Sequence, residues 1–314
     1  MYYFWHILLL LGFGILLTGS AQIVARSVAH ISRVIGITGY SLSFLLLGFC
    51  TSAPEMFVAY RSMVEGVPQL SVGNLLGGSI LLLSLVMGLS SVLYGKITLS
   101  HGMTFREIVL SCIVVASPVL VLWDGALTRI EGALLLGIYI AHALLLNTKT
   151  KVNRHAAYMT HHPSSVVKSI MLLLCGLLAM FVASYFIVEY ATVLIGILHI
   201  PAFVFGLVLL SLGTNLPEFA LAWQAGKSKT KSIAFGDFLG SAAANTPILG
   251  VIGLLSPFRV ANTERIIFSL VLLFTVTLFF VWALSSRKDI TRKEGLGLLL
   301  FYGIFVLFEF LGGS

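Results

Sequence analysis

Apolar runs of roughly 20 residues recur from one end of this chain to the other, and this feature constrains the fold most strongly. Hydrophobic residues make up 58% of the 314-residue chain and charged residues only 10%, against about 25% charged residues in an average soluble domain. A water-soluble globule is excluded because too few polar side chains are available to cover its surface. We therefore predict an integral membrane protein whose spans are all helical, since hydrocarbon leaves unpaired backbone groups without water.

Loop signals divide the chain into ten predicted spans. The second and seventh spans are long and carry proline, glycine and polar residues in mid-run, which predicts an interrupted helix at each place. The predicted fold is thus an all-α integral membrane protein with ten transmembrane helices and interruptions in helices 2 and 7. The ten spans are 4–24, 34–60, 71–94, 105–123, 128–147, 167–190, 202–224, 233–256, 264–286 and 294–312.

Lysine and arginine concentrate in alternate loops. Of the 19 basic residues, 15 lie in the loops after spans one, three, five, seven and nine. By the positive-inside rule these loops are cytoplasmic, so both termini are expected outside. The net charge of +7 is therefore an orientation signal and does not indicate nucleic-acid binding. The first apolar run lacks the features of a cleavable signal peptide, and the short loops favour a prokaryotic inner (plasma) membrane.

The two halves of the chain repeat each other at a fixed offset of 163 residues. Thr-Ser-Ala-Pro-Glu at 51–55 matches Thr-Asn-Leu-Pro-Glu at 214–218, and Gly-Asn-Leu-Leu-Gly at 73–77 matches Gly-Asp-Phe-Leu-Gly at 236–240. Five predicted spans separate the copies, and an odd number turns the second copy upside down in the membrane. Inverted repeats with interrupted helices are typical of secondary transporters, whose substrate site lies near the midplane where the repeats meet.

The repeat divides the chain into two predicted halves. The first covers residues 1–148 with its motif at 48–82, and the second covers residues 167–314 with its motif at 211–245. A polar cytoplasmic linker is expected at 149–166. It contains His155, His161 and His162, which we interpret as part of a connector; metal binding or pH sensing is the alternative.

Two glutamates, Glu55 and Glu218, fall well inside spans two and seven. A carboxylate at bilayer depth costs about 3 kcal/mol on insertion scales, so it normally faces a partner or a cavity. No lysine or arginine lies at comparable depth in the sequence. We therefore predict that a bound cation or a proton neutralises these carboxylates. Two protonated glutamates that only tie helices together are the alternative.

Proline precedes each of these glutamates and frees a backbone carbonyl. Pro54 removes the hydrogen bond to the carbonyl of Cys50, and Pro217 removes the hydrogen bond to the carbonyl of Gly213. The candidate side-chain ligands all carry oxygen, which suits a hard cation such as Ca²⁺ with about six to eight oxygen ligands. Sodium or protons could occupy the same oxygens, and such competition is the physical basis of antiport. The candidates are Glu55, Glu218, Thr51, Ser52, Thr214, Asn215, Ser241 and Asn245.

The predicted site is lopsided. Ser241 and Asn245 share one helical face, but their counterparts at the repeat offset, Gly78 and Leu82, offer no side-chain oxygen. More ligands are therefore expected from the second half. Asn74 and Asp237 lie one to two turns from that face, where they could cap their helices or line an access path.

These motifs resemble the two alpha repeats of the calcium/cation antiporter superfamily, and most closely its sodium/calcium exchanger branch. The resemblance covers nearly the whole chain and implies a site for calcium and sodium around Glu55 and Glu218, with alternating access by sliding of the first and sixth helices. The family usually has serine and asparagine where this chain has Gly78 and Leu82. The motifs that carry the resemblance are Gly-Phe-Cys-Thr-Ser-Ala-Pro-Glu (48–55), Gly-Asn-Leu-Leu-Gly-Gly-Ser (73–79), Gly-Thr-Asn-Leu-Pro-Glu (213–218) and Gly-Asp-Phe-Leu-Gly-Ser (236–241).

The expected function is secondary active antiport of calcium against sodium, with no cofactor and no enzymatic activity. A proton-coupled divalent-cation exchanger on the same scaffold is the alternative. A membrane-embedded enzyme would need a nucleophile and a base within reach of each other, and the spans show no such pair at matching depth. A channel or scaffold would not need two opposed copies of an interrupted helix. Inorganic cations and the lipid bilayer are the expected partners, with no nucleic acid. The sequence leaves the oligomeric state open, and a monomer is one possibility.

Overall fold

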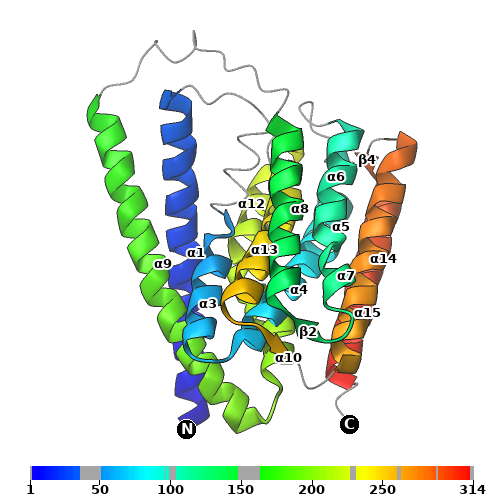
Figure 1. Ribbon diagram of the computed structural model, residues 1–314. Helices are drawn as coiled ribbons and strands as arrows, with labels where there is room; N and C mark the ends of the chain where they lie inside the picture. The colour runs from blue at the N-terminus through cyan, green and yellow to red at the C-terminus, as the bar shows by residue number, and fades with distance from the viewer. Residues whose placement is uncertain are drawn as a thin grey trace.

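The computed structural model describes residues 2–35, 51–95, 97–98, 104–147, 163–226, 231–259, 263–287 and 289–311. This part of the chain is mostly helical, and its helices stand side by side along a common direction (Figure 1). The helices are α1 (Tyr2–Ile35), α3 (Ala53–Val64), α4 (Pro68–Leu81), η1 (Leu82–Val86), α5 (Met87–Tyr94), α6 (Phe105–Ala116), α7 (Pro118–Val121), α8 (Arg129–Asn147), α9 (Pro163–Leu198), α10 (Ala202–Phe205), η3 (Gly206–Leu210), α11 (Ser211–Thr214), α12 (Leu216–Gly226), α13 (Lys231–Leu255), α14 (Thr263–Arg287) and α15 (Arg292–Leu311).

Six described segments are long and apolar enough to cross a membrane, which confirms an integral membrane protein. A shorter apolar stretch follows at Ala202–Thr214. Predicted span 34–60 lies partly outside the described residues, which omit 36–50. The six segments are Trp5–Val28, Pro68–Tyr94, Arg129–Leu146, Val166–Leu198, Phe238–Leu255 and Thr263–Ser285.

Helices α1 and α9 extend well beyond the predicted spans 4–24 and 167–190, with 34 and 36 residues respectively. Helix α9 begins at Pro163. Proline suits the first position of a helix because a backbone N–H at that position would have no partner within the helix. The first residues of α9 thus fall within the predicted linker 149–166. Its three histidines lie outside the described residues.

The centre of the molecule is formed by α4 with its extension η1–α5, and by α13. In the apolar windows of these two segments 83% of the residues are buried, against 28% for α1, α8 and α9. Helices α1 and α9 lie side by side at one edge (Figure 1) and form most of a second apolar cluster, separate from the central one. The outward faces of these peripheral helices are apolar, as contact with lipid requires.

Glycine lets α4 cross α10 and η3 in backbone contact. A Cβ atom at Gly77 would overlap the backbone of Leu207, and one at Gly206 would overlap the backbone of Leu70. Small residues at helix crossings allow this approach inside a membrane. The crossing fixes the helix that leads from η3 to Thr214 against the helix that carries Asn74.

Two short strand pairs occupy equivalent places in the repeat. Strand β1 (Ile97–Thr98) pairs antiparallel with β4 (Asp289–Ile290), and β2 (Ala126–Leu127) pairs antiparallel with β3 (Phe258–Arg259). Strand β4 follows β2 by the 163 residues of the repeat offset. In Figure 1, β4 lies near the top of the bundle and β2 near the bottom. Segments that are equivalent in sequence are therefore found at opposite ends of the bundle.

Candidate cation-binding site

Two breaks in the helices place Glu55 and Glu218 in the first turns of new helices. Ser52 (φ −83°, ψ 7°) precedes α3, and Asn215 (φ −93°, ψ 12°) separates α11 from α12. A proline in each first turn is tolerated because the leading N–H groups of a helix need no internal partner. The amino end of a helix also favours a negative charge. The predicted interruptions thus lie directly before both carboxylates.

Both glutamates are buried, with 2% of Glu55 and 1% of Glu218 exposed. Neither carboxylate oxygen of Glu55 has a hydrogen-bond partner among the residues that the structure describes. Burial without such a partner leaves a negative charge that a proton or a cation must balance.

Hydroxyl groups of the first break meet α13. The Oγ1 atom of Thr51 lies 2.6 Å from Oγ of Ser241, and Oγ of Ser52 donates to the carbonyl of Ser241 at 3.4 Å. All three residues are at most 2% exposed. The structure therefore unites three of the predicted ligands that lie 189 or 190 residues apart in the chain.

The second break meets α4 in a similar way. The Thr214 hydroxyl donates to Oδ1 of Asn74 at 3.1 Å. The side-chain amide of Asn215 donates to the carbonyl of Ser211 at 2.9 Å and to Oγ1 of Thr214 at 3.3 Å. Because a carbonyl can only accept, this contact fixes the Asn215 amide with its NH₂ toward Ser211 and its oxygen turned the other way.

Asn245 of α13 is fixed by the first half of the chain. Its NH₂ group donates to the carbonyl of Leu75 at 3.1 Å and to the hydroxyl of Ser79 at 3.1 Å. Ser79 in turn donates to the Leu75 carbonyl at 3.0 Å. With both amide protons used, the Asn245 oxygen is the atom left for a cation. Sequence reasoning missed Ser79 because its repeat counterpart, Ala242, has no oxygen.

Gly78 borders the site although it carries no ligand. A Cβ atom at Gly78 would lie 3.0 Å from Nδ2 of Asn215 and 3.4 Å from Nδ2 of Asn245. Leu82, the counterpart of Asn245, is fully buried among apolar side chains at the start of η1. The two halves therefore contribute unequal sets of atoms.

Of the remaining predicted residues, the structure places Asn74 and Gly213. Asn74 is fully buried in the middle of α4, whose first residue is Pro68, so it caps no helix and pairs with Thr214 instead. Gly213 lies in the last turn of α11 and is half-buried. The Cys50 carbonyl and the Asp237 side chain lie outside what the structure describes.

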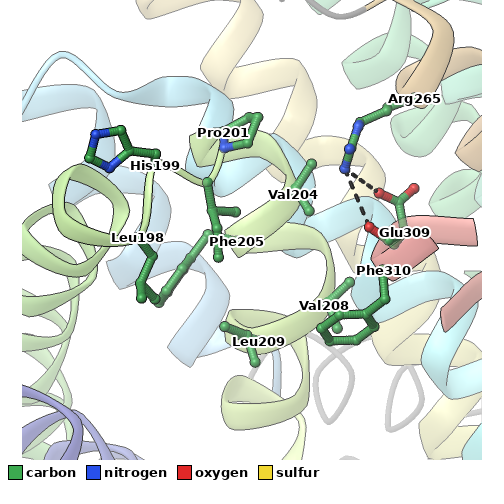
Figure 2. Close-up of a pocket in the computed structure, with 11 residues that line it drawn as sticks. Leu198, His199, Pro201, Val204, Phe205, Val208, Leu209, Arg265, Glu309 and Phe310 are labelled. Carbon is green, nitrogen blue, oxygen red and sulfur yellow. Dashed lines mark hydrogen bonds and ion pairs between the residues drawn. The ribbon is translucent and has the colours of Figure 1, made fainter. Parts of the chain in front are cut away.

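Another buried carboxylate, Glu309, lines a cavity of about 320 Å³ between the α9–α10 connection and the ends of α14 and α15 (Figure 2). Figure 2 shows Arg265 facing Glu309 at one side of this cavity, and the two form an ion pair of 3.4 Å. Apolar side chains such as Val204, Val208 and Leu209 form most of the remaining lining. Since Arg265 already balances its charge, Glu309 does not resemble Glu55 as a cation ligand.

Known proteins match nearly the whole chain. The family model described as "Sodium/calcium exchanger protein" matches residues 5–147 and 168–311. Inner membrane protein YrbG of Escherichia coli (strain K12) is 27% identical and the match covers 93% of this chain and 92% of that protein. Sodium/calcium exchanger MaX1 of Methanosarcina acetivorans is 24% identical, with 97% and 98% covered. A solved structure of the sodium-calcium exchanger NCX_Mj is 25% identical in sequence and has a TM-score of 0.68, and the match covers 98% of this chain and 98% of that one.

Proposed function

The chain belongs to the sodium/calcium exchanger family, and on that premise we propose that it exchanges calcium for sodium across a membrane at a site shared by Glu55 and Glu218. The observation that carries this proposal is the Glu55 carboxylate, which is buried and has no hydrogen-bond partner among the described residues. A charge in that position needs a partner. In this proposal a transported cation is that partner.

The proposed ligands combine both halves of the chain. The two carboxylates balance the charge of one Ca²⁺, and the side-chain oxygens of Thr51, Thr214, Asn215 and Asn245 complete a flexible oxygen shell of the kind that calcium prefers. Sodium binds the same oxygens in the absence of calcium. Because the two ions exclude each other from the site, the protein carries calcium in one direction and sodium in the other.

The proposed architecture has ten transmembrane helices in two inverted five-helix repeats, residues 1–148 and 167–314, with the second span completed by residues before Thr51. The opposite placement of β2 and β4 supports the inversion. Alternating access then follows from sliding of α1 and α9 against the central helices. Their own apolar cluster, which includes Leu17 and Met180, supports movement as one unit.

The protein acts in this proposal in a prokaryotic inner membrane with both termini outside and needs no cofactor. The start of α1 and the end of α15 lie at the same end of the bundle (Figure 1), as an even number of spans requires. A proton-coupled exchanger is the second candidate. The observation that favours it is the missing oxygen at Gly78 and Leu82, since two buried carboxylates can carry protons without further ligands.

Calcium-45 flux in proteoliposomes tests the function. The vesicles are loaded with buffer of fixed composition, and the external solution is changed to impose a sodium gradient or a proton gradient separately. We expect an opposing sodium gradient at constant pH to drive calcium uptake. Uptake driven only by a proton gradient would establish the second candidate, and no uptake under either gradient would overturn the antiport proposal.

A further inference from the structure

The cavity next to Glu309 lies where the membrane-crossing segments end. Leu198 and Arg265 line it, and they lie at the end of the segment Val166–Leu198 and at the start of the segment Thr263–Ser285. Glu309 belongs to the last turn of α15. The end of this helix lies at the same end of the bundle as the start of α1 (Figure 1). Side chains at the ends of membrane-crossing helices lie at the depth of the lipid headgroups.

The cavity opens toward lipid between Leu209 and Phe310, which we call its mouth. These two lining side chains are 44% and 68% exposed, whereas Val204 and Val208, which line the interior, are at most 8% exposed. Phe310 lies beside Glu309 in Figure 2, so the mouth is next to the carboxylate. The volume of about 320 Å³ falls within the range of roughly 300–1,000 Å³ that is typical of ligand sites. An opening bordered by apolar side chains suits a molecule that enters from the bilayer.

The ion pair in this cavity is loose and leaves one acceptor unused. Nη1 of Arg265 lies 3.4 Å from Oε2 and 3.4 Å from the backbone carbonyl of Glu309, whereas charge-assisted hydrogen bonds of this kind measure about 2.7–2.9 Å. The Glu309 side chain is fully buried, and its Oε1 atom has no hydrogen-bond partner among the described residues. The Ser269 hydroxyl, one turn farther along α14, donates to the Arg265 carbonyl. A ligand N–H would therefore satisfy a buried oxygen that is costly to leave without a donor.

The charges of the cavity select a ligand that carries one charge of each sign. Arg265 and Glu309 sum to zero, so a bound anion or a bound cation alone would leave one buried charge uncompensated, which is costly. A zwitterion with a phosphate and an ammonium group pairs with both residues. The planar guanidinium group binds phosphate through two parallel hydrogen bonds, and a primary ammonium group offers three N–H donors to Oε1 of Glu309.

We propose that this cavity binds the headgroup of a zwitterionic phospholipid that has a primary ammonium group. The phosphate binds Arg265, the ammonium group binds Glu309, and the acyl chains pass through the mouth into the bilayer. Basic pockets between membrane-spanning helices bind headgroups in this way. The repeat offset maps the pair onto Gly102 and Leu146, which carry no charge. Since equivalent segments lie at opposite ends of the bundle, the site belongs to one leaflet, and it is independent of the ions that are transported.

Lipid titration of the purified protein in detergent, followed by native mass spectrometry, tests the proposal. Phosphatidylethanolamine, phosphatidylcholine and phosphatidylglycerol with identical acyl chains are compared. We expect phosphatidylethanolamine to bind at least about tenfold more tightly than the others, because phosphatidylcholine lacks the N–H donors and phosphatidylglycerol adds an unbalanced negative charge. Equal binding of all three lipids, or a preference for phosphatidylglycerol, would overturn the proposal. Equally strong competition by glycerophosphoethanolamine, which has no acyl chains, would overturn the assignment to a lipid.

Two substitutions test the assignment to this cavity. Leu209→Trp fills the mouth without removing either charge, and we expect it to abolish the preference for phosphatidylethanolamine. Leu278→Trp is the matched control, because Leu278 is 53% exposed on α14 and is not among the residues that line the cavity. Glu309→Gln leaves the charge of Arg265 uncompensated, and we expect the preference to change to phosphatidylglycerol; native mass spectrometry records this on the folded fraction. An unchanged preference in both Leu209→Trp and Glu309→Gln would contradict the assignment.

Discussion

The hydroxyl oxygens of Thr51 and Ser241 lie 2.6 Å apart although 190 residues separate them in the chain. Thr51 precedes the break before α3, and Ser241 lies within α13. Their contact joins the interrupted helix of the first half to the central helix of the second half. Glu55 lies one turn after Thr51, so this contact also helps to fix the position of the Glu55 carboxylate.

Substitution of Ser79 by alanine should weaken sodium binding through Asn245. Ser79 accepts one of the two hydrogen bonds that orient the Asn245 amide. Its loss costs about 1 kcal/mol, which corresponds to about fivefold in affinity. The half-saturating sodium concentration in calcium flux measures this effect. Ser84→Ala is the matched control because, among the described residues, the Ser84 hydroxyl bonds the carbonyl of Ile80 in its own helix and no group of the site. Equal effects in both variants would contradict the role of Ser79.

Addition of a methyl group at Gly206 should destabilise the protein. A Cβ atom there would overlap the backbone of Leu70, so α10 and α4 would have to separate. Such overpacking costs about 3 kcal/mol. The temperature of unfolding in detergent should fall for Gly206→Ala and remain unchanged for Gly14→Ala, whose added Cβ meets nothing within 4 Å. A thermally stable Gly206→Ala variant would disprove the backbone contact.

Removal of the charge at Glu309 should affect stability and not calcium binding. Glu309 pairs with Arg265 at 3.4 Å, and its side chain is fully buried. Glu309→Gln leaves the arginine without its carboxylate, which costs about 3 kcal/mol for a buried pair. Thermal unfolding and equilibrium calcium-45 binding separate the two effects. Loss of calcium binding in a folded Glu309→Gln protein would place this residue in the site, contrary to our assignment.

Much of the site could be predicted from sequence because the repeat marks it twice. The Thr-x-x-Pro-Glu motif locates both helix breaks, and Ser241 and Asn245 lie one turn apart in a continuous helix. The membrane class and the family also follow directly from apolar runs and motifs, and the comparisons confirm both.

Other features depend on contacts between the halves, which sequence spacing does not reveal. Ser79 has no oxygen-bearing counterpart at the repeat offset, so nothing in the pattern marked it as a partner of Asn245. Asn74 does not cap α4, because this helix starts at Pro68 and Asn74 is buried within it; its place on an access path stays a prediction. The extra length of α1 and α9 was hidden by polar residues near their ends.

The central claim is that Glu55 and Glu218 hold one shared cation. Equilibrium calcium-45 binding to purified protein, with sodium as competitor, tests it most directly. We expect Glu55→Gln and Glu218→Gln each to weaken calcium binding at least about 100-fold, because each removes one of two buried charges that face the ion. Glu309→Gln provides the control for a buried glutamate outside the site. Near-normal calcium binding that sodium still displaces in both variants would contradict the account.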